Sequence, residues 1–318
     1  MTRLLIGGYS GDKGAGSGIA VLDDDQVTAI IPADSPSWIA RHPGLAVLYA
    51  VAETDDGQVH AWSLHDGAPA QHLGCGATGG AEPAHLTVDA SGRYLITANY
   101  SGGSLSVHRL GPDGSIGERT DLIQHEAHGQ DARQEGAHPH MVRTAEDELL
   151  VTDLGGDAIY RYRLTPEGKL MQEGVIPAPP GSGPRHLLQV GGRNYVTAEL
   201  SGQVLVYDAG WHLVGTVPAS NVTGHNQPSE LVSDGRYLYV ANRGPDTISV
   251  FALDNALPRY VTEVKAGEWP RHIALDGDRL YVANERSHTV MIMQIDQETG
   301  IPAVIQSIEV PSPTVVLP

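Results

Sequence analysis

The feature that most constrains this chain is an internal repeat, in which a short segment beginning with proline or histidine occurs seven times. Successive starts are separated by 47, 55, 46, 44, 42 and 43 residues. Periods of this length are typical of repeat architectures, in which each repeat forms one supersecondary unit that packs on its neighbours. The seven segments start at these positions: Pro36, Pro83, His138, Pro184, Pro228, Pro270 and Pro313.

Each repeat contains short runs in which apolar residues alternate with polar ones. The proline segment is followed by a run such as YLITAN or YLYVAN, and then by a run such as SLSVHRL or TISVFAL. Alternation at period two indicates β-strands. Gly, Asp, Ser and Asn fill the intervals, as in hairpin turns, and the chain contains 38 glycines. Several antiparallel strands in a unit of this length are typical of one propeller blade.

The seventh repeat ends after a single strand, and its missing strands are found at the other end of the chain. RLLIGGYS, residues 3–10, has the form of a second strand, and GIAVLDD, residues 18–24, has the form of a third. Pairing of the two chain ends would leave no open sheet edge. We therefore predict an all-β fold: one seven-bladed β-propeller domain over residues 1–318, with the last blade closed by the N- and C-terminal strands and the C-terminal strand innermost.

Charge and composition exclude several classes of partner. The 20 basic and 38 acidic side chains give a net charge of −18, which disfavours binding to nucleic acid or to an anionic membrane. The single cysteine, Cys75, excludes an internal disulfide framework. Neither a signal-peptide pattern nor an apolar run of membrane-spanning length is present, so we expect a cytoplasmic protein. A closed ring satisfies its own edges, so we expect a monomer, with a homodimer as the alternative.

The repeat also predicts where polar side chains gather. In an up-down blade, the start of the first strand and the end of the second strand lie on one face of the disc, at one mouth of the central channel. Two PRH segments, at Arg185-His186 and Arg271-His272, fall at such starts, and Glu199 ends a second strand. Buried or half-buried arginine needs an anionic partner. The arginines therefore predict an anionic ligand at this mouth, whereas individual histidines there fit a structural role equally well.

The longest interval, 55 residues, contains a polar insertion over residues 124–140 that includes Arg133 and Gln134. Loops of unusual length often carry function. Its histidines raise the possibility of a metal site, but their spacing matches no zinc signature and no cysteine joins them, so we expect neither a metal nor a cofactor. Cys75 lies in a turn-like GCGATGG segment with no evident base, which disfavours nucleophilic catalysis. The candidate metal ligands considered are His125, His128, His138 and His140.

Several of these runs are familiar. PAHLTVDASGRYLITANYSGGSLSVHRL, RQEGAHPHMV, GPRHLL and PRHIALDGDRLYVANERSHTVMIMQID resemble the seven-bladed lactonase family, and the resemblance extends over essentially the whole chain. It implies hydrolysis of 6-phosphoglucono-δ-lactone to 6-phosphogluconate without a required metal or cofactor. A related branch of the family cyclises carboxymuconate. Two departures from the family pattern are Ala137, where the family has proline, and Pro139, where it has a small residue.

The resemblance also implies roles for particular residues. Glu199 or His140 would act as the general base, Arg185 would hold the oxyanion, and Arg271, with Arg243 or Arg133, would hold the phosphate. Two other functions stay open: a carboxymuconate-type lactonising cyclase, and a non-catalytic propeller that binds a protein partner. The predicted catalytic residues are His140, Arg185, Glu199 and Arg271, and the predicted substrate-binding residues are Arg133, Gln134, His138, His186, Arg243, His272 and Glu285.

Overall fold

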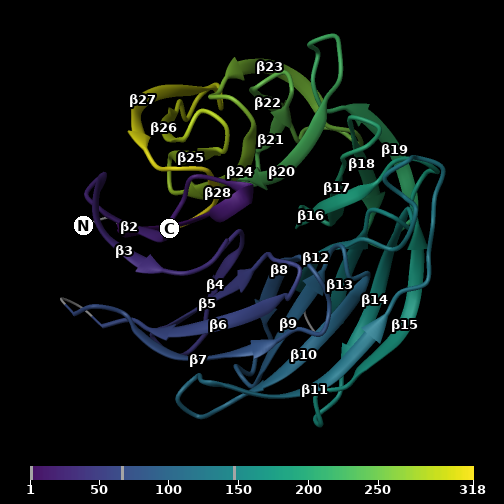
Figure 1. Ribbon diagram of the computed structural model, residues 1–318. Helices are drawn as coiled ribbons and strands as arrows, with labels where there is room; N and C mark the ends of the chain where they lie inside the picture. The colour runs from purple at the N-terminus through teal and green to yellow at the C-terminus, as the bar shows by residue number, and fades with distance from the viewer. Residues whose placement is uncertain (1–2, 66–67, 146–147) are drawn as a thin grey trace.

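The computed structural model describes residues 3–65, 68–145 and 148–318. Strands β1 to β28 in these residues form seven four-stranded antiparallel sheets, arranged as blades around a central axis (Figure 1). One short 3-10 helix, η1 (Gly11–Lys13), precedes β2. The seven-bladed β-propeller predicted from the repeat is therefore confirmed. Within the described residues, no helix has the length and apolar character needed to cross a membrane.

Six blades are continuous in sequence, and each runs outward from the axis to the periphery (Figure 1). Blades 1 to 3 consist of β4 (Ile39–Arg41), β5 (Val47–Ala52), β6 (Gln58–Ser63) and β7 (Gln71–Ala77); β8 (Pro83–Val88), β9 (Tyr94–Asn99), β10 (Ser104–Leu110) and β11 (Ile116–Gln124); and β12 (Pro139–Ala145), β13 (Glu148–Asp153), β14 (Ala158–Leu164) and β15 (Leu170–Pro177). Blades 4 to 6 consist of β16 (Pro184–Val190), β17 (Arg193–Ala198), β18 (Gln203–Asp208) and β19 (Leu213–Pro218); β20 (Gln227–Ser233), β21 (Tyr237–Arg243), β22 (Thr247–Ala252) and β23 (Arg259–Lys265); and β24 (Pro270–Asp276), β25 (Arg279–Asn284), β26 (Thr289–Ile295) and β27 (Pro302–Glu309).

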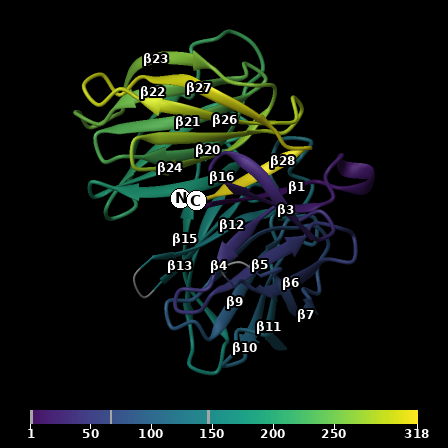
Figure 2. The same ribbon diagram turned by 90° about the vertical axis from the view of Figure 1, so that its left-hand side faces the viewer.

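Blade 7 is built from both ends of the chain. Its order is β28 (Pro313–Leu317), β1 (Arg3–Gly8), β2 (Gly18–Asp23) and β3 (Gln26–Pro32), with β28 innermost as predicted. β28 pairs antiparallel with β1, so that Ile6 lies opposite Val316. Figure 2 shows β28 and β1 side by side where the ring closes. The closing pair is stabilised by ladder hydrogen bonds and by packing between blades.

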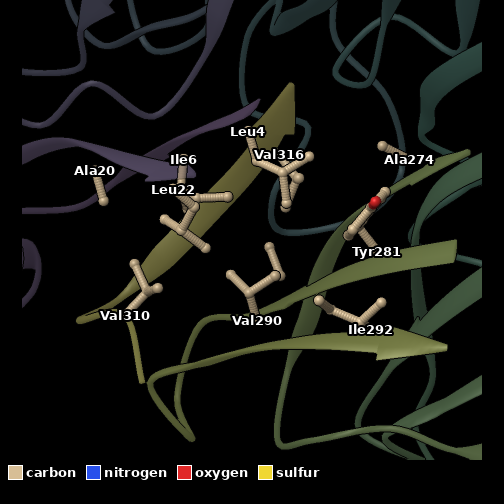
Figure 3. Close-up of a cluster of buried hydrophobic side chains, with 11 residues drawn as sticks. Leu4, Ile6, Ala20, Leu22, Ala274, Tyr281, Val290, Ile292, Val310 and Val316 are labelled. Carbon is tan, nitrogen blue, oxygen red and sulfur yellow. The ribbon is translucent and has the colours of Figure 1, made fainter. Parts of the chain in front are cut away.

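The core lies between neighbouring blades rather than at one centre. Between blades 6 and 7, Leu4 and Val316 pack with Val290, Ile292 and Tyr281, and all five are at most 1% exposed (Figure 3). Similar clusters lie between the other blades. Alternation along each strand therefore buries apolar side chains on both faces of a blade, each against a different neighbour.

Six of the seven inner strands, all except β4, have a break in the regular ladder near their first residues. In β16, for example, the register shifts between Pro184 and Leu187. Such bulges bend a strand and re-aim side chains, and they are common next to active sites. The residues left out of the ladder in the inner strands are Ala84, His140, Arg185, His186, Ser229, Glu230, Arg271 and Thr314.

The turn-like interpretation of the segment around Cys75 is wrong. Gln71–Ala77 is the outer strand β7, and Cys75 pairs across the ladder with His60 of β6. The strand contains two glycines, and the extra residue Leu73 forms a bulge beside Gly74, which has a φ of 128° and pairs with Ala61. The glycines that suggested a turn therefore bend an edge strand instead.

Candidate active site

Glu199 lies at the centre of a cluster of guanidinium groups at one mouth of the channel. Its Oε1 accepts a hydrogen bond of 2.6 Å from Arg133 Nη1, and its Oε2 accepts one of 2.8 Å from Arg185 Nη1. Arg243 Nη2 forms an ion pair of 2.7 Å with the same Oε2. The side chains of Glu199, Arg185 and Arg243 are 1%, 5% and 4% exposed, whereas that of Arg133 is 41% exposed. Three arginines from three different segments thus share one carboxylate.

The charges in this cluster shift one another's pKa values. Burial alone would raise the pKa of Glu199, but Arg243, Arg185 and Arg133 outweigh it and hold this pKa well below its usual range. Burial lowers the pKa of Arg243 to about 9, partly opposed by Glu199. Glu199 is therefore ionised under all ordinary conditions, and its charge is already shared among cations.

His140 is the next residue in this network. Its Nε2 accepts a hydrogen bond from Arg185 Nη1, so the ring is neutral with its lone pair directed at the arginine. Burial, and then the Arg185 charge, hold the pKa of His140 well below its ordinary value. Tyr100 packs edge-on against His140 and stacks on His138, with ring centroids 5.5 and 4.6 Å apart. His140 consequently orients Arg185 and has little basicity of its own.

Arg271 belongs to a second network on the other side of the mouth. Its Nη1 donates to Glu285 Oε2 at 3.2 Å, and its Nη2 donates to the phenol oxygen of Tyr9. The Tyr9 hydroxyl in turn donates to Glu53 Oε1 at 2.7 Å, and Ser37 Oγ donates to Glu53 Oε2. Glu53 also lies 3.6 Å from Lys13 Nζ. Two neutral hydroxyl groups and one more distant ammonium therefore surround Glu53, in contrast to the three guanidinium groups around Glu199.

The two networks meet at a small cavity of about 10 Å³. This is close to the least space that holds one water molecule. A carboxylate, two guanidinium groups and two imidazoles are among its walls. The residues that line it are Ser37, Trp38, Glu53, Ala84, His140, Arg185, His186, Arg271 and Thr314.

A layer of rings closes the channel next to this cavity. Trp38 stacks on His85 at 4.0 Å and meets His186 and His272 edge-on at 5.4 and 5.2 Å. His186 Nδ1 lies 2.7 Å from Glu230 Oε2, and His272 Nε2 lies 3.5 Å from the same oxygen. Burial raises the pKa of Glu230 and lowers that of His272 to about 4. His186 and His272 therefore belong to a weakly charged layer of buried side chains. Of these two histidines, only His186 also borders the cavity.

The insertion before β12 delivers Arg133 to the mouth, and Gln134 holds the insertion in shape. Gln134 Oε1 accepts hydrogen bonds from the backbone of Gln130 and Asp131, and Gln134 Nε2 donates to the Leu154 carbonyl at 2.8 Å. These contacts use both ends of the Gln134 amide and join the insertion to the segment after β13. Gln134 is thus a scaffold for Arg133, and the substrate contact predicted for it stays a prediction.

The histidines of the insertion are engaged in separate contacts. His125 binds Asp153 and Tyr162, each at 2.8 Å, and His138 Nδ1 lies 3.0 Å from the Tyr100 carbonyl oxygen. In the described part of the chain, no group of three or more His, Cys, Asp or Glu residues is arranged as metal ligands.

Of the residues predicted from the sequence, the structure gathers Arg133, His138, His140, Arg185, Glu199, Arg243, Arg271 and Glu285 in the two networks. Five participants were missed as site residues: Tyr9, Lys13, Ser37, Glu53 and Tyr100. Glu53 has a signal in the sequence, because VLYAVAE ends one repeat's second strand as YVTAE ends another's. Tyr9 and Tyr100 also have a signal, because each directly follows a second-strand run at the repeat position that Arg243 and Glu285 occupy in other blades.

A much larger cavity, of about 840 Å³, lies away from this mouth, between β3 of blade 7 and β6 and β7 of blade 1. Its walls are mostly apolar, and neither Arg–Glu network borders it. Size alone therefore does not identify the reactive site here, because hydrolysis needs polar groups that converge on one point.

The fold agrees with comparisons with known proteins. The family model "Lactonase, 7-bladed beta-propeller" matches residues 3–318. A 6-phosphogluconolactonase of Bacillus subtilis is 32% identical over 259 residues, which cover 74% of this chain and 73% of that protein. One of Formosa agariphila is 30% identical over 300 residues, covering 85% of each. The solved structure of a periplasmic gluconolactonase of Pseudomonas aeruginosa superimposes with a TM-score of 0.90 at 29% identity, over 99% of this chain and 98% of that one. The chain belongs to the seven-bladed β-propeller lactonase family.

Proposed function

We propose that this chain hydrolyses a small anionic lactone, 6-phosphoglucono-δ-lactone, to 6-phosphogluconate at the mouth of the channel. The observation that carries this proposal is the cavity on which Glu53, Arg185, Arg271 and His140 converge. The names of the Bacillus subtilis and Formosa agariphila relatives support the choice of substrate. A δ-lactone is already reactive, so the protein needs only to position water and to stabilise the tetrahedral oxyanion.

Arg185 and Arg271 are the groups that would stabilise the oxyanion. Both line the cavity, and each is fixed by partners that leave the guanidinium charge in place: Glu199 and His140 for Arg185, and Glu285 and Tyr9 for Arg271. Fixed donors in a water-poor site stabilise developing negative charge without having to reorganise during the reaction. His140 acts as a positioning residue for Arg185.

Glu53 is the group that we propose as general base, in place of Glu199 or His140. A base must be able to take up a proton, and three guanidinium groups hold the pKa of Glu199 well below its usual range. The lone pair of His140 Nε2 is occupied by Arg185. Glu53 instead borders the cavity and is held by two hydroxyl groups. Water in the cavity would give a proton to Glu53 as its oxygen attacks the lactone carbonyl carbon. Collapse of the tetrahedral intermediate would then break the ring C–O bond, and Glu53 would return the proton to the departing ring oxygen.

The phosphate needs a cation that solvent can reach. Arg243 is 3% exposed and committed to Glu199, whereas the side chain of Arg133 is 41% exposed and that of Lys13 is 33% exposed. We therefore assign the phosphate to Arg133, with Lys13 as a second candidate. A guanidinium group can bind phosphate through two parallel hydrogen bonds.

The test is hydrolysis of freshly prepared 6-phosphoglucono-δ-lactone, corrected for spontaneous opening, beside unphosphorylated glucono-δ-lactone and a carboxymuconate. The Arg133→Ala variant is expected to raise KM for the phosphorylated lactone and to leave that for the unphosphorylated one nearly unchanged. Equal losses for both lactones would contradict the phosphate assignment. Conversion of carboxymuconate with no lactone hydrolysis would favour the cyclase alternative, since the same arginines would bind carboxylates.

We further propose that the protein acts in the cytoplasm, where its phosphorylated substrate would be found. The periplasmic gluconolactonase of Pseudomonas aeruginosa makes cell fractionation the relevant measurement. A monomer, with a homodimer as the alternative, remains the expectation from ring closure, and sedimentation analysis would decide between them.

A further inference from the structure

Two histidines outside the active site lie unusually close together on the outer strands of blade 1. His60 on β6 and His72 on β7 approach with His60 Nδ1 3.2 Å from His72 Nε2. Their ring centroids are 5.4 Å apart. Both residues border the cavity of about 840 Å³ between blades 7 and 1. Neither takes part in the two networks of the mouth, so lactone hydrolysis does not explain the pair.

The separation of the two nitrogens matches that of two ligands on one metal ion. Zn²⁺ binds imidazole nitrogen at about 2.0–2.1 Å, which puts two ligands about 2.9 Å apart at a right angle and about 3.4 Å apart at the tetrahedral angle. The observed 3.2 Å falls between these values. At this distance the two nitrogens cannot both carry a proton, so one lone pair is always directed into the space between the rings.

The surroundings of the pair hold the two rings in place and leave space beside them. A metal ion binds the neutral imidazole, the form in which one ring nitrogen keeps a lone pair. Trp62 packs against both histidine rings, at 5.7 and 5.4 Å, and is itself 4% exposed, so it fixes the orientation of the rings. The adjoining cavity leaves room for water ligands.

We propose that His60 Nδ1 and His72 Nε2 form a two-histidine site for a divalent transition-metal ion such as Zn²⁺, with water in the remaining positions. The ion would join β6 to β7 at the outer edge of blade 1. Imidazole suits Zn²⁺, Cu²⁺ and Ni²⁺, whereas Mg²⁺ and Ca²⁺ prefer oxygen ligands. Two ligands with water make an open, exchangeable site, not a closed structural one.

The first experiment is calorimetric titration of the tag-free, chelator-treated protein with Zn²⁺, for wild type and His72→Ala. His72 is exposed, so its replacement is not expected to unfold the blade. Because loss of an outer-shell partner alone weakens metal sites about 10- to 100-fold, loss of a ligand is expected to weaken binding at least that much. Wild-type binding to one ion per chain, weakened in this way, supports the proposal. Equal binding by both proteins, or no binding by wild type, overturns it.

Two controls separate the pair from other sources of binding. His212→Ala removes another exposed histidine, on blade 4, and is expected to bind Zn²⁺ as wild type does. Cys75 lies opposite His60 in the ladder, so Cys75→Ser tests whether its thiolate is the ligand. Retained binding by Cys75→Ser supports the histidine pair, and loss of binding assigns the site to the thiolate and overturns it.

A second readout uses the fluorescence of Trp62. Cu²⁺ in the pair would lie beside this indole and quench it. Trp38 packs against the same core cluster as Trp62, so Trp62→Phe is needed to assign the quenched component. The quenched component is expected to disappear in Trp62→Phe and in His72→Ala. Quenching that persists in both variants would overturn the assignment. Lactone hydrolysis is expected to stay the same with and without Zn²⁺, so this proposal and the proposed function can fail separately.

Discussion

Replacing Glu199 with glutamine tests whether one buried carboxylate stabilises the arginine cluster at the channel mouth. The substitution keeps the shape of the side chain but removes the charge that neutralises Arg185 and Arg243, whose side chains are 5% and 4% exposed. Its amide group also introduces a donor where the neighbours are donors. Two guanidinium charges would then be buried without their anion.

The expected loss of stability follows from the burial of these contacts. Removing one partner of a buried ion pair costs about 3–5 kcal/mol, because the other charge stays buried and uncompensated. The contact with Arg133 adds little, since its guanidinium is 41% exposed. For 318 residues the entropy of unfolding is about 0.7 kcal/mol/K. Glu199→Gln is therefore expected to lower Tm by about 4–7 °C.

Differential scanning calorimetry of wild type and Glu199→Gln measures this loss, and pH gives a second check. The pKa of Glu199 is lowered in the folded protein, so its stabilisation is complete above the unfolded value of about 4.3 and is lost as pH falls below it. The difference in Tm should be constant from about pH 6 to 8 and shrink in acid. Added phosphate should raise the Tm of the variant more than that of wild type. A Tm within about 1 °C of wild type at neutral pH would refute the reasoning.

Three further predictions address the mouth and the core. Glu53→Gln should lower kcat by about 10²–10⁴-fold. Glu82→Gln, which alters the contacts of Glu82 with Lys13 and Ser101 at the rim, should change kcat little; comparable effects in steady-state assays would argue against Glu53 as base. Arg271→Ala should lower kcat by about 10²–10³-fold, because an oxyanion donor is lost. Arg271→Lys should restore little activity, because one ammonium group cannot replace the two guanidinium nitrogens that contact Glu285 and Tyr9. Full activity of either variant would remove Arg271 from the mechanism. Leu4→Ala, at a site 1% exposed between blades 6 and 7, should lower the free energy of unfolding in urea by about 2–5 kcal/mol. Leu213→Ala, at a site 45% exposed, should lower it far less. Equal losses would contradict the packing described for the closing blade.

Much of the fold could be predicted because local patterns in the sequence specify it. Period-two alternation specifies strands, the repeat specifies blades, and the incomplete seventh repeat specifies that β28 and β1 must pair. The face that carries the site follows from the direction of the strands. These features depend on residues near one another in sequence, or on simple counting, and so need no knowledge of packing.

The roles of the polar residues could be predicted only in part. The repeat places Arg185, Arg271 and Glu199 at the mouth, and the resemblance to the lactonase family implies the role of His140. Which group can act as a general base depends on which carboxylate receives the arginines, and the sequence does not show that. Glu199 is contacted by three, from β16, from β21 and from the insertion, and Glu53 is held by hydroxyl groups.

The sequence by itself therefore determined the seven blades, their closure and the mouth at which arginines gather. Only the tertiary structure decided what each polar group does there. Bulges in the inner strands take Arg185, His186, His140 and Arg271 out of the regular ladder. The physical reason is that the charge and basicity of a buried group are set by neighbours that come from other blades. Tyr9, far from Arg271 in the chain, contacts it only because the ring closes.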